Sequence, residues 1–362
     1  MPTALAIGTE KGLFLATSSD DRRTWRVGEP QFPMTAVYAV GVDTRPLTPR
    51  LFAGVTSSHF GPTVAVSDDF GATWAEPDHS PLAFPADTDV ALERVWQFAA
   101  AGPDEPGVVY AGTQPSALFR STDGGVNYEL VSGLWNHPHR LSWGAGFGGQ
   151  AVHTVLPEAG DPDRLLVAMS TGGVYRSTDA GRNWSPANKG IKAYFMPDQW
   201  PEYGQCVHKV ARDAGDPRRL YAQNHHGVYR SDDGGDQWQS IADGLPTDFG
   251  FVIVAHPHTP GTVYTFPITA DGMRFPPDHR CRVYRSRDAG ESWEALTEGL
   301  PTEPYYPIVL RDAMCCDAAE TAGVYFGTRS GEVFGSPNEG DTWSRIAAQL
   351  PDVLCLRAFE TT

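Results

Sequence analysis

The sequence predicts an all-β fold, a seven-bladed β-propeller, and two observations carry this prediction. An eight-residue pattern, Ser-x-Asp-x-Gly-x-x-Trp, recurs along the 362 residues, and its closing aromatics, from Trp25 to Trp343, lie 49 to 56 residues apart. No helical periodicity interrupts these units, and the spacing leaves room for four short strands in each. Radial closure of seven such units into a ring protects the strand edges.

Each copy of the pattern predicts a tight turn between two strands. The Ser and Asp side chains cap backbone amides within the turn, the Gly accepts a positive φ, and the aromatic begins the next strand. The copies read SDDFGATW at 67, STDGGVNY at 121, STDAGRNW at 177, SDDGGDQW at 231, SRDAGESW at 286 and SPNEGDTW at 336, and a worn copy, SSDDRRTW at 18, has Arg22 in place of the glycine.

Three further strands are expected before each turn. An aromatic-rich strand such as GVYRS (173–177) leads into the turn, a strand such as LYAQ (220–223) comes before that position in its unit, and an apolar strand such as QAVHTV (150–155) comes first. The chain starts with the later strands of a blade and ends in a lone apolar strand. We therefore expect residues 1–362 to form a single domain in which residues 1–28 and 352–360 share the first blade.

The repeated pattern resembles the Asp-box, also called the BNR repeat. The chain is similar in this respect to bacterial BNR-repeat proteins described as sialidase-like or glycosyl hydrolase-like, and Asp-boxes also occur in xyloglucanases, sortilin-type receptors and a photosystem assembly propeller. The resemblance implies a propeller with structural box residues, since the box lies on a peripheral hairpin in those families. The chain has no Phe/Tyr-Arg-Ile-Pro segment near its N-terminus, which argues against a sialidase.

Composition excludes several classes of protein. Hydrophobic residues make up 41% and charged residues 20%, as in soluble globular proteins, and no apolar run approaches the roughly 20 residues that span a bilayer. A net charge of −16 repels polyanions. The first residues show no signal peptide, and five cysteines without CxxC spacing suit reduced thiols. We expect a cytoplasmic protein that binds neither nucleic acid nor membranes.

Long loops predict a ligand site at one mouth of the central channel, where propellers commonly bind small molecules. The loops at 133–150 and 188–205 are rich in aromatics, 76–94 is long and acidic, and 267–282 is expanded. Aromatic rings mixed with carboxylates and arginines suit a carbohydrate or another polar or acidic small molecule. The expected ligand-binding residues are Tyr38, Glu93, Arg94, Gln97, Arg140, Trp143, Trp200 and His225, of which Arg94 and Arg140 would hold anions and Trp143 and Trp200 would form walls.

Two near-identical heptapeptides open the innermost strands of adjacent blades, GQAVHTV at 149–155 and GQCVHKV at 204–210. Their histidines, His153 and His208, take equivalent positions just inside the channel mouth. A histidine there either faces the channel or bonds to a carbonyl of the neighbouring blade. The same alignment puts Tyr38, Gln97, Phe251 and Asp312 in this layer.

Three functions are open at this point, and the first is favoured. A glycosidase-like hydrolase needs two carboxylates about 5–10 Å apart, for which Glu93, Asp198, Glu202 and Asp312 are candidates.

The second function is a lyase or hydrolase centred on histidine, and the third is a non-catalytic binding or assembly scaffold. A histidine site could bind a divalent metal ion or supply an acid and a base. The expected catalytic residues are His153, His208, Glu202 and Asp312, and a metal ion, the one cofactor considered, would be held by His153, His208 and His225.

Overall fold

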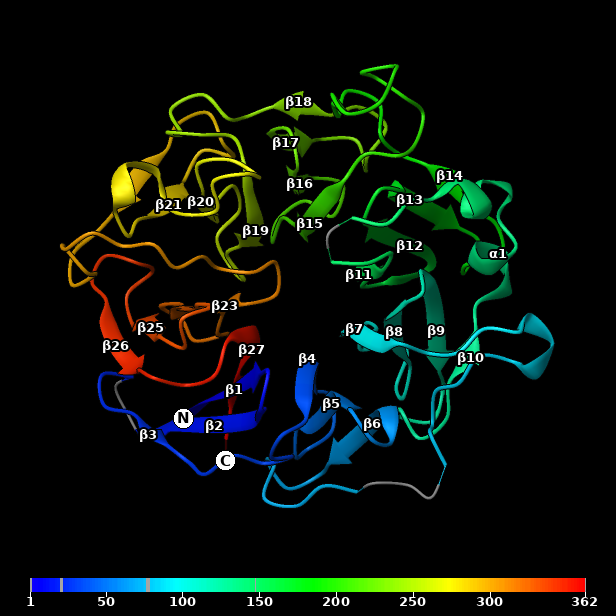
Figure 1. The fold of residues 1–362 in the computed structure, drawn as a ribbon, viewed down its shortest axis with the longest axis horizontal. Coiled ribbons are helices and arrows are strands. Elements are labelled where there is room, and N and C mark those ends of the chain that lie inside the picture. The colour runs from blue at the N-terminus through cyan, green and yellow to red at the C-terminus, as the bar shows by residue number, and fades with distance from the viewer. Residues whose placement is uncertain (1, 20–21, 76–78, 147, 362) are drawn as a thin grey trace.

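Seven antiparallel sheets stand around a central axis like the blades of a propeller (Figure 1). The computed structural model describes residues 2–19, 22–75, 79–146 and 148–361. Six of its sheets have four strands and one has three, which confirms the predicted fold. Helix is limited to α1 (Ser132–Trp135) and to short 3₁₀ turns at Ala86–Thr88, Pro138–Ser142 and Pro277–His279. Among the described residues no helix is long and apolar enough to cross a membrane.

The strands follow one another from the channel outward in each blade. Blade 1 holds β1 (Thr3–Thr9), β2 (Gly12–Ser18) and β3 (Arg26–Val27); blade 2 holds β4 (Ala36–Asp43), β5 (Arg50–Ser57) and β6 (Gly61–Ser67); blade 3 holds β7 (Arg94–Ala100), β8 (Val109–Gln114), β9 (Ala117–Ser121) and β10 (Glu129–Leu130); blade 4 holds β11 (Val152–Glu158), β12 (Asp161–Met169), β13 (Gly173–Thr178) and β14 (Ser185–Pro186). Blade 5 holds β15 (Val207–Arg212), β16 (Leu220–Asn224), β17 (Val228–Ser231) and β18 (Gln239–Ser240); blade 6 holds β19 (Gly250–Ala255), β20 (Val263–Pro267), β21 (Val283–Ser286) and β22 (Glu294–Leu296); blade 7 holds β23 (Met314–Cys316), β24 (Val324–Gly327), β25 (Val333–Ser336) and β26 (Ser344–Ala347).

The C-terminal strand closes the ring. β27 (Val353–Glu360) pairs antiparallel with β1, with Thr3 opposite Glu360 and Thr9 opposite Val353, so it becomes the innermost strand of blade 1. Figure 1 shows the red end of the chain beside its blue start. This is the closure that the lone apolar strand at 352–360 predicts.

The repeated turn has the same hydrogen bonds in six blades, and blade 4 illustrates them. The Ser177 hydroxyl donates to Asp179 Oδ1 (2.8 Å) and accepts from the Gly181 N–H (2.9 Å), while Asp179 Oδ1 accepts from the Asn183 N–H (2.8 Å). Gly181 has a φ of +83°, which a residue with a Cβ rarely adopts. In the worn copy, Arg22 keeps a positive φ of 57° at the glycine position, whereas residues 20 and 21 lie outside the described part.

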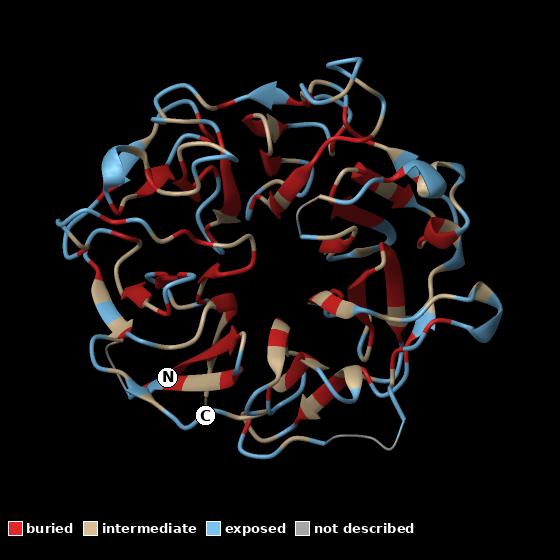
Figure 2. Ribbon diagram, in the orientation of Figure 1, coloured by how far each residue is buried: buried red, intermediate tan, exposed pale blue. Residues whose placement is uncertain are grey.

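Burial is concentrated in the inner three strands of each blade (Figure 2). The aromatic that ends each turn packs into the space between blades. Trp238 of blade 5, for example, is 5% exposed and donates its Nε1–H to the Ala187 carbonyl of blade 4 (2.8 Å). The turns therefore stabilise the outer edge of the propeller, and the residues at the channel end of each blade remain available for a functional site.

Candidate functional site

A β-bulge near the start of the innermost strand recurs around the ring. Pairing with the second strand skips one residue in blades 2 to 5 and a short stretch in blade 6, and a matching skip occurs in the closing strand of blade 1. A bulge leaves its extra residue out of the ladder and re-aims its side chain. The residues at these positions are Leu354, Tyr38, Trp96, His153, His208 and Phe251.

A cavity of about 870 Å³ occupies this end of the channel. It draws its wall from all seven blades and includes every residue of the bulge positions except His153. Its other lining residues are Glu10, Arg94, Gln114, Ala145, Gly146, Gly148, Gly149, Ser170, Thr171, Phe195, Cys206, His225, Phe249, Asp271, Arg274, Leu310, Arg311, Asp312 and Arg329. Of the expected site residues, Tyr38, Arg94, His208, His225 and Asp312 lie on this wall.

Trp96 takes the channel position that the sequence alignment assigns to Gln97. The bulge between Val95 and Gln97 shifts the register by one residue, which turns Trp96 toward the cavity. Gln97 is buried between blades instead, where its Oε1 accepts from the Val155 N–H (2.5 Å).

Glu93 stands behind the cavity wall. This exposed side chain accepts a hydrogen bond from Gln114 Nε2 (2.5 Å), and Gln114 Oε1 accepts from Trp96 Nε1 (3.1 Å). Glu93 is therefore placed to orient the Trp96 ring through Gln114 and does not itself line the cavity.

The two equivalent histidines have different surroundings. His208 lines the cavity, and its Nδ1 lies 2.6 Å from the Gly250 carbonyl of the next blade, so Nδ1 carries the proton and Nε2 keeps a lone pair. His153 is 1% exposed and does not line the cavity. Burial lowers the pKa of both imidazoles well below 6.5, which keeps both neutral.

Asp312 is held in a buried ion cluster. Its Oδ2 accepts from Arg357 Nη2 (2.6 Å), and its Oδ1 binds Lys209 Nζ. Burial alone would raise the pKa of this carboxyl, but Arg357 and Lys209 hold that pKa below its usual value. A carboxylate committed to two cations is a poor proton donor, so the geometry favours a structural role for Asp312 over the catalytic role expected from the sequence.

The remaining expected residues lie away from the cavity, although other residues of the same loops, such as Ala145 and Phe195, line it. Trp143 is 6% exposed and donates to the Tyr175 hydroxyl (2.9 Å) of β13, the third strand of its blade. The Arg140 guanidinium stacks 3.9 Å from the Trp135 ring. Trp200 and Glu202 line a separate cleft of about 350 Å³ near the rim.

Arginines gather around Trp96. The guanidinium carbons of Arg311 and Arg94 lie 5.2 and 5.8 Å from its ring, and Arg94 also lies 4.3 Å from the Tyr38 ring. Arg311 donates to Ser170 Oγ at 3.5 Å, and burial lowers its pKa. Within the described ranges, neither Arg94 nor Arg311 has a carboxylate within ion-pair distance.

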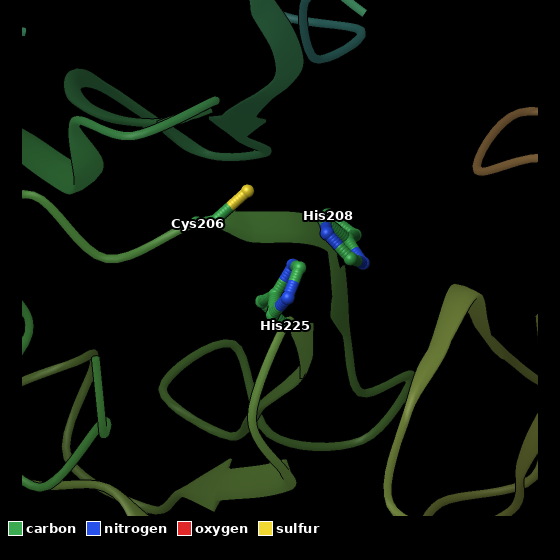
Figure 3. Close-up of side chains that lie close together, drawn as sticks. All are labelled: Cys206, His208 and His225. Carbon is green, nitrogen blue, oxygen red and sulfur yellow. The ribbon is translucent and has the colours of Figure 1, made fainter. Parts of the chain in front are cut away.

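A thiol and two imidazoles converge beside these arginines. The ligand atoms of Cys206, His208 and His225 all lie within 4.8 Å of one another (Figure 3). This group shares two members with the expected metal set, but Cys206 takes the place of His153. The signal for Cys206 was present in the sequence, since GQCVHKV has Cys206 where GQAVHTV has Ala151, and the only other difference is Lys209 in place of Thr154. Asp271 lies in the expanded loop at 267–282 without having been singled out, and nothing in the sequence distinguished Trp96 or Arg311.

Comparison with known proteins gives relatives of one kind by sequence. No family model matches the chain. It is 27% identical to a xyloglucanase of Hypocrea jecorina over 77% of the chain, and 26% identical to a probable oligoxyloglucan-reducing end-specific xyloglucanase of Neosartorya fischeri over 64%. A Paenibacillus xyloglucanase is 25% identical over 68%. The chain spans 33%, 24% and 26% of these relatives' own lengths.

Solved structures share the fold at low identity. An ancestral GH74 enzyme superposes with a TM-score of 0.59 at 18% identity, covering 86% of this chain and 38% of the other. YCF48 from Cyanidioschyzon merolae superposes with a TM-score of 0.57 at 14% identity, covering 86% of this chain and 85% of the other.

Proposed function

We propose that this propeller is a glycosidase-like protein that binds an acidic carbohydrate in the channel-mouth cavity. The observation that carries the proposal is the wall around Trp96, where aromatic rings and two guanidinium groups without carboxylate partners face one space. The similarity to proteins named xyloglucanases supports the carbohydrate class. We also propose that the repeated turn is an Asp-box, since its hydrogen bonds give the motif the structural role that the resemblance implies.

Aromatic faces suit the apolar faces of sugar rings, and polar groups around them fix orientation. Trp96 is held by its hydrogen bond to Gln114, and Tyr38 by its hydroxyl bond to Glu10 Oε1 (3.3 Å). Phe251 of blade 6 lines another part of the cavity. The rings are fixed before a ligand arrives, which reduces the entropy lost on binding.

The charged side chains on the cavity wall favour an acidic ligand. The chain carries a net charge of −16, yet four arginines and three carboxylates line the cavity, and Asp312, one of the three, is bound to Lys209 and Arg357. Arg94 and Arg311 are thus poised to hold a carboxylate or a sulfate group, because guanidinium presents several donors to such anions.

Glu10 and Asp271 are the carboxylates left for chemistry on this wall. Glu10 comes from the β1–β2 turn and accepts from Tyr38, whereas Asp271 follows β20 and lies 3.4 Å from His225 Nε2. We propose that these two act as the acid and base or nucleophile across a glycosidic bond. The scaffold alternative stays a prediction, and a concave cavity enclosed by all seven blades gives it no support.

Binding tests the ligand class. Calorimetric titration should detect an oligosaccharide that carries a uronic acid and much weaker binding of its neutral counterpart. Arg311→Gln should weaken the acidic ligand at least tenfold without lowering thermal stability, because it removes a buried cation that has no carboxylate partner. Arg140→Gln, stacked on Trp135 away from the cavity, is the matched control. Equal binding of both sugars, or an unaffected Arg311→Gln, would contradict the acidic ligand.

Product analysis tests the reaction. Asp271→Asn and Glu10→Gln should each lower hydrolysis of a bound oligosaccharide at least a hundredfold while the dissociation constant changes little. Glu202→Gln, in the rim cleft, should leave hydrolysis unchanged. Wild-type binding without any product would support a scaffold instead, and a loss confined to Glu202→Gln would move the active site to the rim.

A further inference from the structure

We propose that Cys206, His208 and His225 bind a transition-metal ion of the zinc class, with one coordination position open to the channel-mouth cavity. Their ligand atoms lie within 4.8 Å of one another and belong to a single blade (Figure 3). This inference does not rest on the proposed function, although both use Asp271, because metal binding can succeed or fail whether or not the cavity holds a carbohydrate.

Local backbone structure places the three side chains together. Cys206 directly precedes β15, and His208 is the bulged residue of that strand, whose side chain the bulge turns toward the cavity that Cys206 also lines. His225 follows β16, and its backbone N–H donates to the Cys206 carbonyl (2.9 Å), which joins the two segments. Figure 3 shows the His225 ring rising between Cys206 and His208.

The hydrogen bonds around the imidazoles leave lone pairs for an ion. His208 Nδ1–H donates to the Gly250 carbonyl, so Nε2 is free to coordinate. His225 Nε2 lies 3.4 Å from Asp271 Oδ2, and donation to that carboxylate leaves Nδ1 as the ligand. Carbonyl or carboxylate partners on the second ring nitrogen are typical of histidines that bind metals.

The surroundings hold the rings in place. Phe251 and Phe249 lie 4.8 and 5.7 Å from the His208 ring, and Phe249 lies 5.0 Å from the His225 ring. An incoming ion would bind the imidazole lone pairs and displace the proton of the Cys206 thiol to solvent.

The donor set selects the metal. One thiolate and two imidazoles suit zinc and do not suit magnesium or calcium, which prefer oxygen. Tetrahedral coordination at about 2.0–2.3 Å needs ligand atoms about 3.3–3.8 Å apart, so a small ring rotation completes the site. The fourth position faces the cavity, where Gly146 leaves room: a Cβ on Gly146 would lie 3.9 Å from Cys206 Sγ.

The neighbouring blade provides an internal comparison. Blade 4 has the same bulge and the same histidine, but Ala151 and Ser170 stand where blade 5 has Cys206 and His225. The equivalence is exact in the backbone, since the Ser170 N–H donates to the Ala151 carbonyl (3.2 Å) as His225 does to Cys206. The bulge alone therefore does not need these ligands, and alanine is tolerated at the cysteine position.

Metal titration tests the site. Chelator-treated full-length protein should bind one equivalent of Zn²⁺ by calorimetry with release of about one proton, and Co²⁺ should give the charge-transfer absorption of a thiolate ligand. Cys206→Ala copies blade 4, so it should fold, abolish the Co²⁺ thiolate band and weaken Zn²⁺ at least tenfold. Cys281→Ala, a buried thiol of blade 6, is the matched control and should bind like wild type.

His225→Ser makes the second substitution toward blade 4, and it should weaken Zn²⁺ at least tenfold as well. Three outcomes would overturn the proposal: no stoichiometric Zn²⁺ binding by wild type, an unchanged Co²⁺ spectrum in Cys206→Ala, or unchanged Zn²⁺ affinity in His225→Ser. Thermal melting of each variant without metal checks that a loss of binding comes from the ligand and not from unfolding.

Discussion

Replacing Asp312 with asparagine separates a structural carboxylate from a catalytic one. The Asp312 side chain is 5% exposed, and it joins Lys209 of blade 5, 11% exposed, to Arg357 of the closing strand β27, 20% exposed. Asp312→Asn leaves both cations buried without their counter-charge. Removal of one partner of a buried ion pair costs about 3–5 kcal/mol, and we expect a loss of that size in the free energy of unfolding.

Urea denaturation at two pH values measures this loss. The folded pKa of Asp312 is lower than its ordinary value of 3.8, so its stabilising effect is complete above about pH 4 and disappears as the pH falls through the lower folded value. The gap between wild type and Asp312→Asn should be full at pH 7 and close in acid. Asp161→Asn removes a surface pair with exposures of 44% and 49% and should cost less than about 1 kcal/mol.

Stability decides the outcome. If the free energy of unfolding of Asp312→Asn lies within about 1 kcal/mol of the wild-type value, the ion cluster does not stabilise the closed ring. If it also loses hydrolysis at full stability, the catalytic role expected from the sequence is restored.

Two further predictions concern the fold. Ser177→Ala removes a hydroxyl that makes two hydrogen bonds in the turn of blade 4 and should lower the free energy of unfolding by about 1–2 kcal/mol in urea, whereas the exposed Ser185→Ala should change little. Burial depresses the pKa of His153 below 6.5, so the unfolded chain binds more protons there and stability falls as the pH drops below about 6.5. The urea midpoint should fall less between pH 7.5 and pH 5.5 in His153→Leu than in wild type, whereas the exposed His59→Asn should show the wild-type fall. A wild-type fall in His153→Leu would contradict a depressed pKa of His153.

The fold was predictable because the same turn chemistry is written into the chain many times. A Ser hydroxyl, an Asp carboxylate and a Gly with positive φ form a local structure that needs no long-range information, and their spacing sets the blade length. The closure of the ring was predictable from the number of strands expected at the two ends of the chain. Both predictions needed only local sequence patterns.

The site was predictable only in part, because it depends on where loops fold and where bulges fall. Loop composition pointed to Trp143 and Trp200, but those side chains bury against blade 4 or line the rim cleft. A one-residue bulge exchanged Gln97 for Trp96, and a bulge has no clear sequence signal. Arg94 was found because it lies on a regular strand close to a bulge position, and His208 because its heptapeptide repeats that of His153.

The two heptapeptides show how one backbone position acquires different chemistry. In both blades the bulge turns a histidine inward, and the strand after it pairs in the same way. In blade 4 His153 is buried and does not line the cavity. In blade 5 His208 lines the cavity, and Cys206 and His225 add two ligand atoms to it. Repetition therefore accounts for the histidine position, whereas the cysteine and the second histidine distinguish blade 5 and carry the case for a function there.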